Sequence, residues 1–283
     1  YLLLDEFQYI KDSGLFIKTL YDSTKEYLNI IVSGSSSLQI SRTKEFLTGR
    51  KIEFNLSTFS FREFLSIQSE NKYDFSFDIN GDFSDLKNFY MLYKNDLSAN
   101  LINYINWGGY PEVVLHKEIN KKSLILKDII NTYIEKDIVN FLRVEGVASF
   151  NNLVTVLSNQ IGNLVNKNEL SNTLGIHSKT LNKYIDILEG TFVFDFLPPF
   201  YTNIRKEISK MKKVYLNDFG IRRYTMNSSY SEFRLIPGDI IENFVFLCLK
   251  NFFDSKDIYF YRTISKAEID FIIKKDSYIL IES

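Results

Sequence analysis

Cysteine is almost absent from this sequence, and its scarcity excludes several kinds of protein. Among the 283 residues there is a single cysteine, Cys248, so no disulfide can form within the chain and a disulfide-stabilised extracellular domain is excluded. The neighbours Phe246 and Leu249 are apolar, which indicates that Cys248 is a core residue rather than a nucleophile. A chain without disulfides fits a reducing compartment, and we expect a cytoplasmic location.

Long apolar runs and a strong net charge are also missing. No stretch approaches the roughly 18 consecutive apolar residues that a bilayer-spanning helix requires, so we expect no membrane partner. The formal net charge of −1 gives no overall attraction to nucleic acid, and any DNA contact would have to rest on a local basic patch. With 45% hydrophobic residues the composition is that of a globular protein, and 283 residues suffice for two or more domains.

The sequence that is present begins with a strand that ends in two acids. Residues 1–4 are all apolar, as in a strand buried on both faces of a parallel sheet, and Asp5 and Glu6 follow directly. Ligands of open α/β sheets bind beyond the carboxyl ends of the strands. A carboxylate pair there suits ATP hydrolysis, in which the first holds Mg²⁺ through its water shell and the second orients or deprotonates the attacking water. The alternative is an acidic first helical turn, where both residues favour the helix dipole.

A second strand brings a serine cluster towards these acids. The periodicity of residues 15–27 predicts a helix and the apolar residues 30–32 predict a strand, which with the first strand make one βαβ unit. Because its two strands are parallel, their carboxyl ends lie on the same side, and the serines that follow come close to the two acids. Ser33 or Ser35 can then hydrogen-bond the terminal phosphate or the attacking water. Alternatively, the cluster caps the next helix.

An arginine and a capping box follow along the chain. Arg50 stands just before residues 51–56, whose alternating apolar side chains predict a third strand. A guanidinium there can reach a phosphate in the same subunit or in a neighbouring one, which would make the protein a homo-oligomer; a solvated side chain is the alternative. Ser60 and Glu63 have the spacing of a capping box, which predicts that a helix begins between them.

Four motifs therefore occur in a fixed order within the first 65 residues. They are Asp5-Glu6-Phe7-Gln8, Ser33-Gly34-Ser35-Ser36-Ser37, Leu47-Thr48-Gly49-Arg50 and Phe59-Ser60-Phe61-Arg62-Glu63-Phe64-Leu65. In order and spacing they resemble a widespread group of prokaryotic AAA-type P-loop ATPases. The resemblance implies that Asp5 and Glu6 are the Walker B pair and that residues 33–36 hold the sensor-1 position. It also implies that Arg50 senses the phosphate or acts as an arginine finger, with ATP and Mg²⁺ as cofactors.

One element of that family is missing from the sequence. No G-x-x-x-x-G-K-[ST] loop occurs, although the family carries one upstream of the Walker B strand. That loop supplies the backbone cradle and the lysine that hold the phosphates. We therefore expect the sequence to be an internal segment of a longer protein, and these residues alone to bind ATP weakly.

The expected domain boundaries follow the changes in pattern. Residues 1–69 read as the carboxy-terminal part of a P-loop ATPase core, and residues 70–147 as a helical lid. Helices are expected near 86–104 and 120–144. Between them, Trp107-Gly108-Gly109-Tyr110-Pro111-Glu112 resembles a Gly-Gly-aromatic-Pro-Glu turn in the lid of the same ATPase group.

Residues 148–220 have the pattern of a winged helix-turn-helix. Two short helices at 168–174 and 178–188, with a glycine in the turn, precede strands expected at 191–200 and 213–217. The helical pair has no net charge, which favours packing or oligomerisation over DNA binding. Basic residues gather beside the second strand, and a DNA contact is expected through four of them: Arg205, Lys206, Lys212 and Lys213. A solvated loop is the alternative.

Residues 221–283 combine an acid on a helix with two acids on neighbouring strands. The helix is expected at 239–252 and the strands at 258–262, 268–273 and 278–282. This arrangement resembles the PD-(D/E)xK nuclease fold and implies a second metal site made of Glu242, Asp270 and Glu282. In that fold a lysine stands two residues after the last acid, whereas this sequence ends at Ser283. Metal-dependent cleavage would therefore be a property of a longer protein. We do not expect it of these residues alone.

The sequence thus predicts an α/β fold in four parts: part of a P-loop ATPase parallel sheet, a helical lid, a winged helix-turn-helix, and an α+β PD-(D/E)xK-like domain. The leading interpretation is ATP binding and hydrolysis that drive a conformational change of the carboxy-terminal half. The alternative is a DNA-binding or DNA-cleaving protein that ATP regulates. A third interpretation is a nucleotide-gated protein that binds a partner protein without either activity.

Overall fold

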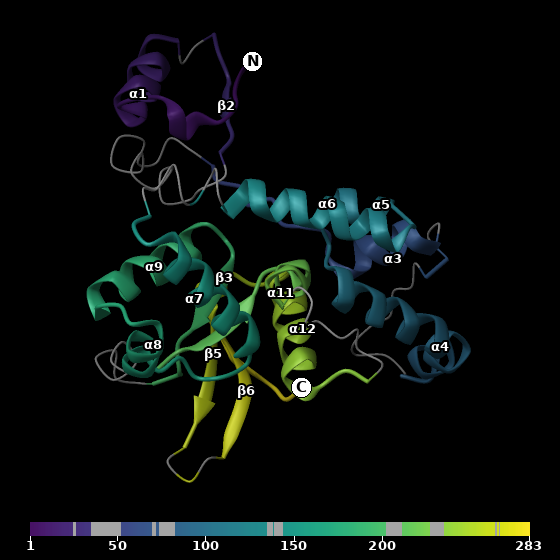
Figure 1. The fold of residues 1–283 in the computed structure, drawn as a ribbon. Helices are drawn as coiled ribbons and strands as arrows, with labels where there is room; N and C mark the ends of the chain where they lie inside the picture. The colour runs from purple at the N-terminus through teal and green to yellow at the C-terminus, as the bar shows by residue number, and fades with distance from the viewer. Residues whose placement is uncertain are drawn as a thin grey trace.

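The computed structural model describes most of the chain, and Figure 1 shows how its elements are arranged. The described residues are 1–24, 27–34, 52–69, 72–73, 83–134, 138, 144–201, 211–226, 235–263, 265 and 267–283, without the side chain of Gln8. The α-helices are α1 (Ser13–Thr24), α3 (Phe61–Ser69), α4 (Ser84–Trp107), α5 (Pro111–Leu115), α6 (Ile119–Asn131), α7 (Val147–Asn159), α8 (Lys167–Leu174), α9 (Ser178–Gly190), α11 (Phe219–Met226) and α12 (Gly238–Lys250). The strands are β1 (Leu2–Leu4), β2 (Ile30–Val32), β3 (Phe194–Leu197), β4 (Lys213–Leu216), β5 (Ile258–Arg262), β6 (Glu268–Lys274) and β7 (Tyr278–Ile281). Among the described helices, none is both long and apolar enough to cross a membrane.

A small parallel sheet forms the amino-terminal unit. β1 and β2 pair along three residues each, and α1 packs on one face of the pair, where Phe7 and Ile17 are buried. On the other face Leu3 is 71% exposed and Ile31 is 53% exposed. The expectation that the first strand is buried on both faces is therefore wrong for the described residues, because α1 covers only one side.

The third predicted strand does not form among the described residues. Residues 52–56 alternate as expected, but they carry no regular secondary structure. Ile52, Phe54 and Leu56 are 82%, 88% and 102% exposed. Alternating side chains form a strand only where a neighbouring strand supplies hydrogen bonds and a core covers one face. Among the described residues, segment 52–56 has neither a neighbouring strand nor a covered face.

The helices after this segment begin where the capping box predicts. The Ser60 hydroxyl donates to Glu63 Oε2 at 2.7 Å, the Ser60 amide donates to the same oxygen at 2.8 Å, and α3 starts at Phe61. α4, α5 and α6 lie within residues 70–147, α3 lies before them, and Figure 1 shows the four helices above and to the right of α11 and α12. Phe61 joins the two sides, because its ring lies 5.3 Å from that of Phe244 on α12.

α8 and α9 form where the sequence predicts two short helices joined by a turn with a glycine. Asn166 caps α8 by accepting hydrogen bonds from the amides of Asn168 and Glu169, and Gly175 ends the helix in the left-handed conformation. β3 and β4 pair antiparallel behind these helices. The short helix α11 follows β4 and was not predicted. It contacts α4, α6 and α7, and thus lies at the centre of the main core.

The carboxy-terminal sheet shares a core with β3 and β4. β5, β6 and β7 form an antiparallel sheet, and a parallel bridge between Pro199 and Phe260 joins it to the end of β3. Tyr215 of β4 stacks on Phe246 of α12 with ring centres 4.5 Å apart, and Phe271 of β6 lies beside both. The expected boundary at residue 220 therefore cuts through one hydrophobic cluster rather than between two.

A buried carboxylate, that of Asp218, holds three distant segments together. It accepts hydrogen bonds from the amides of Gly109 at 2.8 Å and Gly220 at 2.7 Å. The Gly109 carbonyl also accepts a hydrogen bond from the Phe59 amide at 2.9 Å. The approach is so close at Gly108 that an added Cβ would lie 2.0 Å from Asp218 Oδ1. We call this set of contacts the Asp218 junction.

We predict that Gly108→Ala is far more destabilising than Gly175→Ala. Gly175, with φ +62° and ψ +33°, is in the left-handed region, where alanine costs roughly 1–2 kcal/mol, whereas Gly108, with φ +77° and ψ −171°, is in a region that essentially only glycine adopts. A Cβ at position 175 meets nothing within 4 Å, whereas one at 108 collides with the Asp218 junction. We expect a loss above about 3 kcal/mol for Gly108→Ala, measured by urea unfolding. Equal losses for the two variants would contradict the close packing at this turn.

Candidate functional site

The carboxyl ends of β1 and β2 bring Asp5 and Ser33 into contact. The parallel register places Leu4 opposite Val32, so the next residue of each strand leaves the sheet at the same edge. There the Ser33 hydroxyl donates to Asp5 Oδ1, and the Glu6 amide donates to the same oxygen at 3.0 Å. The Ser33 carbonyl accepts from the Phe7 amide at 2.9 Å, which ties the turn after β1 to the end of β2.

These hydrogen bonds favour the ionised form of Asp5. The Ser33 hydroxyl, followed by the Glu6 amide, lowers the pKa of the Asp5 carboxyl below its ordinary value. Both bonds use Oδ1, so in the described part of the chain Oδ2 is the oxygen available to a hydrated cation. An ionised carboxylate held at one oxygen suits a Mg²⁺ ion that keeps its water shell.

Glu6 projects from the same edge in an unusual conformation. Its φ of 51° and ψ of 43° are left-handed, which is uncommon for a residue with a side chain, and the residue is exposed. Residues held in such regions cost of the order of 1–3 kcal/mol each and cluster at functional sites. The structure thus brings Asp5, Glu6 and Ser33 together, whereas Ser35 and Arg50 lie outside the described residues.

The predicted DNA contacts are only partly described. Arg205 and Lys206 lie outside the described residues, and Lys212 is half-buried. Burial raises the pKa of Glu189, and the positive charge of Lys212 nearby opposes that rise, so Lys212 already has an acidic neighbour. Lys213 is buried, with its side chain 4% exposed, and pairs with Glu242. Assigning Lys213 to DNA is therefore wrong, because its ammonium is internal.

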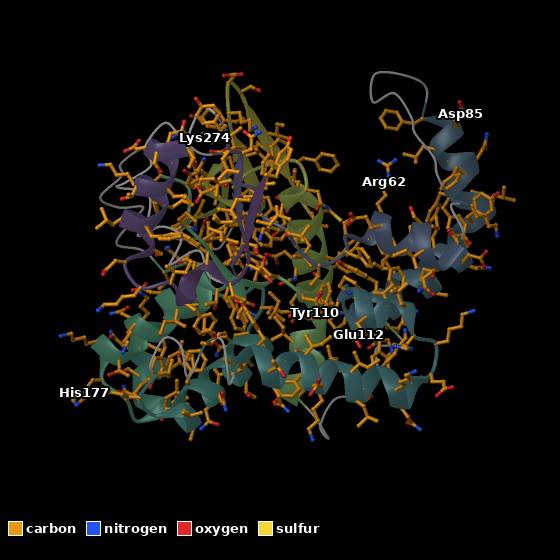
Figure 2. The ribbon with its side chains drawn as sticks, turned by 90° about the horizontal axis from the view of Figure 1, so that it is seen from above. Arg62, Asp85, Tyr110, Glu112, His177 and Lys274 are labelled. Carbon is orange, nitrogen blue, oxygen red and sulfur yellow. The ribbon has the colours of Figure 1, made fainter. Side chains whose placement is uncertain are left out.

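The helix-turn-helix presents a polar outer surface without a basic excess. Figure 2 shows His177, in the turn between α8 and α9, pointing away from the body of the molecule. Lys167 donates to Asn182 Oδ1 at 2.7 Å, so two of the polar side chains on this surface bond each other. The two helices and their turn are present, and Lys167 is already bound to a side chain of the protein.

The second predicted metal site does not assemble. Among the described residues no group of three or more histidine, cysteine, aspartate or glutamate side chains is placed to hold a metal ion. Glu242 Oε1 accepts from Lys213 and from Tyr215, and Asp270 Oδ2 accepts from the amide and the hydroxyl of Ser283. Glu282 is exposed. The proposed ligands Glu242 and Asp270 therefore have partners from the protein itself.

Sequence reasoning missed the residue that connects this region to the rest of the chain. Asp218 is not among the residues that the sequence singles out, yet it is 3% exposed. Burial raises its pKa to about 6, against the opposing hydrogen bonds from Gly109, Thr58 and Gly220. Thr58 belongs to the segment that follows the amino-terminal unit, so the Asp218 junction links that segment to α4 and α11. The glycine two residues after Asp218 was a local sign of a turn. The other hydrogen-bond partners of Asp218 are distant in the sequence, and residue spacing does not reveal them.

Trp107 marks the other side of the same turn. The guanidinium carbon of Arg223 lies 3.5 Å from the centre of the Trp107 ring, and Lys122 Nζ lies 5.5 Å from it. Burial, followed by the charge of Arg223, lowers the pKa of Lys122. The stacking of Arg223 on Trp107 makes it part of the packing between α4 and α11.

Comparisons with known families divide the chain into three parts. Residues 1–65 match the model of an AAA domain, residues 98–232 match a domain of unknown function, DUF8612, and residues 237–283 match another, DUF4143. The amino-terminal part is thus AAA-domain-like, and the chain is similar to an AAA-type ATPase. Neither of the other two matches describes a winged helix or a nuclease.

Relatives of the whole chain occur in bacteria and archaea. An uncharacterized protein of Haemophilus influenzae is 26% identical over 286 residues, covering 99% of this chain and 64% of the relative. The uncharacterized protein MJ1544 of Methanocaldococcus jannaschii is 25% identical over 289 residues, covering 99% of this chain and 60% of the relative. The chain thus spans less than two thirds of the length of either relative. No solved structure matches it.

We predict a pH dependence of stability that belongs to Asp218. Its folded pKa of about 6 lies above the ordinary value of 3.8, so its contribution to stability is fully present below pH 4 and is lost as the pH rises through 6. Each unit of difference corresponds to roughly 1.4 kcal/mol. Between pH 4 and pH 7, the free energy of unfolding of the parent should fall relative to that of Asp218→Asn, measured by urea titration at each pH. Parallel profiles for the two proteins would contradict this assignment.

Proposed function

We propose that this chain belongs to an ATPase in which the carboxyl edge of β1 and β2 holds the Mg²⁺ of bound ATP and activates water. The observation that carries the proposal is the contact between Asp5 and Ser33 at the ends of two parallel strands, with Glu6 exposed beside it. The match of residues 1–65 to an AAA domain supports the same assignment.

Each of these three side chains has a distinct task in the proposed reaction. Asp5 holds the hydrated Mg²⁺ through the oxygen that Ser33 leaves available. Glu6 orients the attacking water and accepts its proton, for which an exposed carboxylate next to the metal ligand is suited. Ser33 keeps Asp5 in position, and its hydroxyl lies where the terminal phosphate would be sensed. The bound Mg²⁺ would neutralise charge that develops on the phosphate oxygens.

The other roles in the proposal belong to residues outside this group of three side chains. Arg50 would sense the phosphate in the same subunit or reach it from a neighbouring one, and Ser35 would assist Ser33. The carboxy-terminal half would respond to hydrolysis through the segment that follows Arg50, whose end is held at Phe59 and Thr58 by the Asp218 junction. This route gives nucleotide turnover a physical path to α4 and α11.

DNA binding is the weaker candidate. The helix-turn-helix geometry of α8 and α9 favours it, but Lys213 is internal and Lys212 has an acidic neighbour. A salt-dependent affinity for duplex DNA would require the positive surface that these residues do not supply.

We predict that Glu6→Gln, in the full-length protein, lowers the rate of ATP hydrolysis by about two orders of magnitude or more while ATP binding stays nearly unchanged. The amide keeps the size of the side chain but cannot take a proton. The turnover rate would be measured by phosphate release and binding by a fluorescent ATP analogue. Asp85→Asn is the matched control, since Asp85 is exposed at the far end of α4 from α1 (Figure 2). Hydrolysis by Glu6→Gln at the parental rate would refute the role of Glu6.

A further inference from the structure

A buried lysine joins three elements of the carboxy-terminal half. Lys213 is the first residue of β4, and its Nζ pairs with Glu242 Oε1 of α12 at 2.8 Å and with Glu268 Oε1 of β6. The side chains of Glu242 and Glu268 are 14% and 25% exposed, and that of Lys213 is 4% exposed. Two carboxylate oxygens therefore converge on one point away from bulk water, and the ammonium occupies it.

Three further side chains surround the Lys213 ammonium and its two glutamates. Tyr215, two residues along β4, donates its hydroxyl to Glu242 Oε1 at 2.5 Å. The Phe260 ring lies under the ammonium, with its centre 5.5 Å from Nζ. Arg262 approaches Glu268 from the outside at 3.5 Å. The charge of each glutamate is therefore compensated by a cation of the protein, as a buried ion pair requires.

One of these acids, Glu242, belongs to the metal site that the sequence predicts together with Asp270 and Glu282. Burial raises the pKa of Glu242, and the negative charge of Asp270 adds to that rise, so Asp270 lies within electrostatic reach of the cluster. A divalent ion at this position would have to displace Lys213 and leave its ammonium buried without an acceptor. Such an uncompensated charge costs several kcal/mol, which strongly disfavours the exchange.

We propose that the Lys213 ammonium is the permanent cation of this carboxylate cluster. It stands where a divalent ion would sit and docks α12 and β6 onto β4. The cluster of the parent protein accordingly takes no Mg²⁺ or Mn²⁺, and the sheet β5–β7 serves as a rigid docked element rather than as a metal-dependent nuclease. This proposal concerns only the carboxy-terminal half and is independent of the ATPase assignment.

The proposal has a direct test in the divalent-ion affinity of two variants. Lys213→Ala leaves two carboxylate oxygens facing the vacated point, with Asp270 nearby, so it should gain a Mn²⁺ site. We expect at least tenfold tighter Mn²⁺ binding than in the parent, measured by electron paramagnetic resonance and by calorimetry, and we expect Mn²⁺ to raise the melting temperature of this variant. Adding Glu242→Gln to Lys213→Ala should remove the gain.

Lys250→Ala is the matched control for loss of a paired lysine. Lys250 Nζ lies 2.6 Å from Asp195 Oδ2 and also bonds Asn217, so its removal exposes one carboxylate and no converging pair. This variant should bind Mn²⁺ no better than the parent. A gain as large as that of Lys213→Ala would show that the effect is only a change of net charge.

Two results would overturn the proposal. The first is Mn²⁺ binding by the parent protein at a site that Glu242→Gln abolishes. The second is a folded Lys213→Ala variant, with the parental circular dichroism spectrum, that binds Mn²⁺ no better than the parent. If Lys213→Ala does not fold, the comparison of the parent with Glu242→Gln decides alone. A metal site in the parent would show as Mn²⁺ binding that Glu242→Gln abolishes.

Discussion

The carboxylate of Asp218 fixes three segments that are far apart in the sequence. A charge removed from water must be compensated by hydrogen bonds, and the donors here come from Gly109, Gly220 and Thr58. If any one of these segments moves away, the carboxylate loses a donor that water does not replace at a site with 3% exposure. The segments therefore move together, or Asp218 takes up a proton.

A second buried charge has the same effect farther along the chain. Lys213 ties β4 to α12 and β6, and the stacked rings of Tyr215 and Phe246 lie beside it. The two charges are five residues apart in sequence, at the two ends of the stretch that contains β4. Together they link the turn after α4, β4, α12 and β6, on both sides of the expected boundary at residue 220.

Local patterns were sufficient wherever the partners are close in sequence. The capping box of Ser60 and Glu63, the helix pair around Gly175 and the strand β6 follow from spacing and turn chemistry, and the structure has all three. The failures concern partners that are distant. Whether a second layer covers Leu3 depends on elements outside its βαβ unit, and Lys213 looks like a surface cation until the acids 29 and 55 residues later are folded around it. Asp218 escaped notice for the same reason.

Within the candidate site, the adjacency of Asp5 and Ser33 was accessible because a βαβ unit dictates it. The left-handed conformation of Glu6 was not, since it depends on how the turn after β1 bonds the end of β2.

The distribution of buried side chains shows where movement is least costly. Among its described residues, the amino-terminal unit buries the large side chains of Phe7 and Ile17, which contribute roughly 1.5–3 kcal/mol each. The framework around the Asp218 junction has a far larger core. Between the two, Ile52, Phe54 and Leu56 are almost fully exposed, and farther along the same segment the Phe59 amide donates to the Gly109 carbonyl. A rearrangement at the edge of β1 and β2 thus deforms the weakly packed side first and reaches the framework at Phe59. In the proposed function, this difference in packing would let a nucleotide reaction displace the weakly packed side while the stiffer framework receives the displacement.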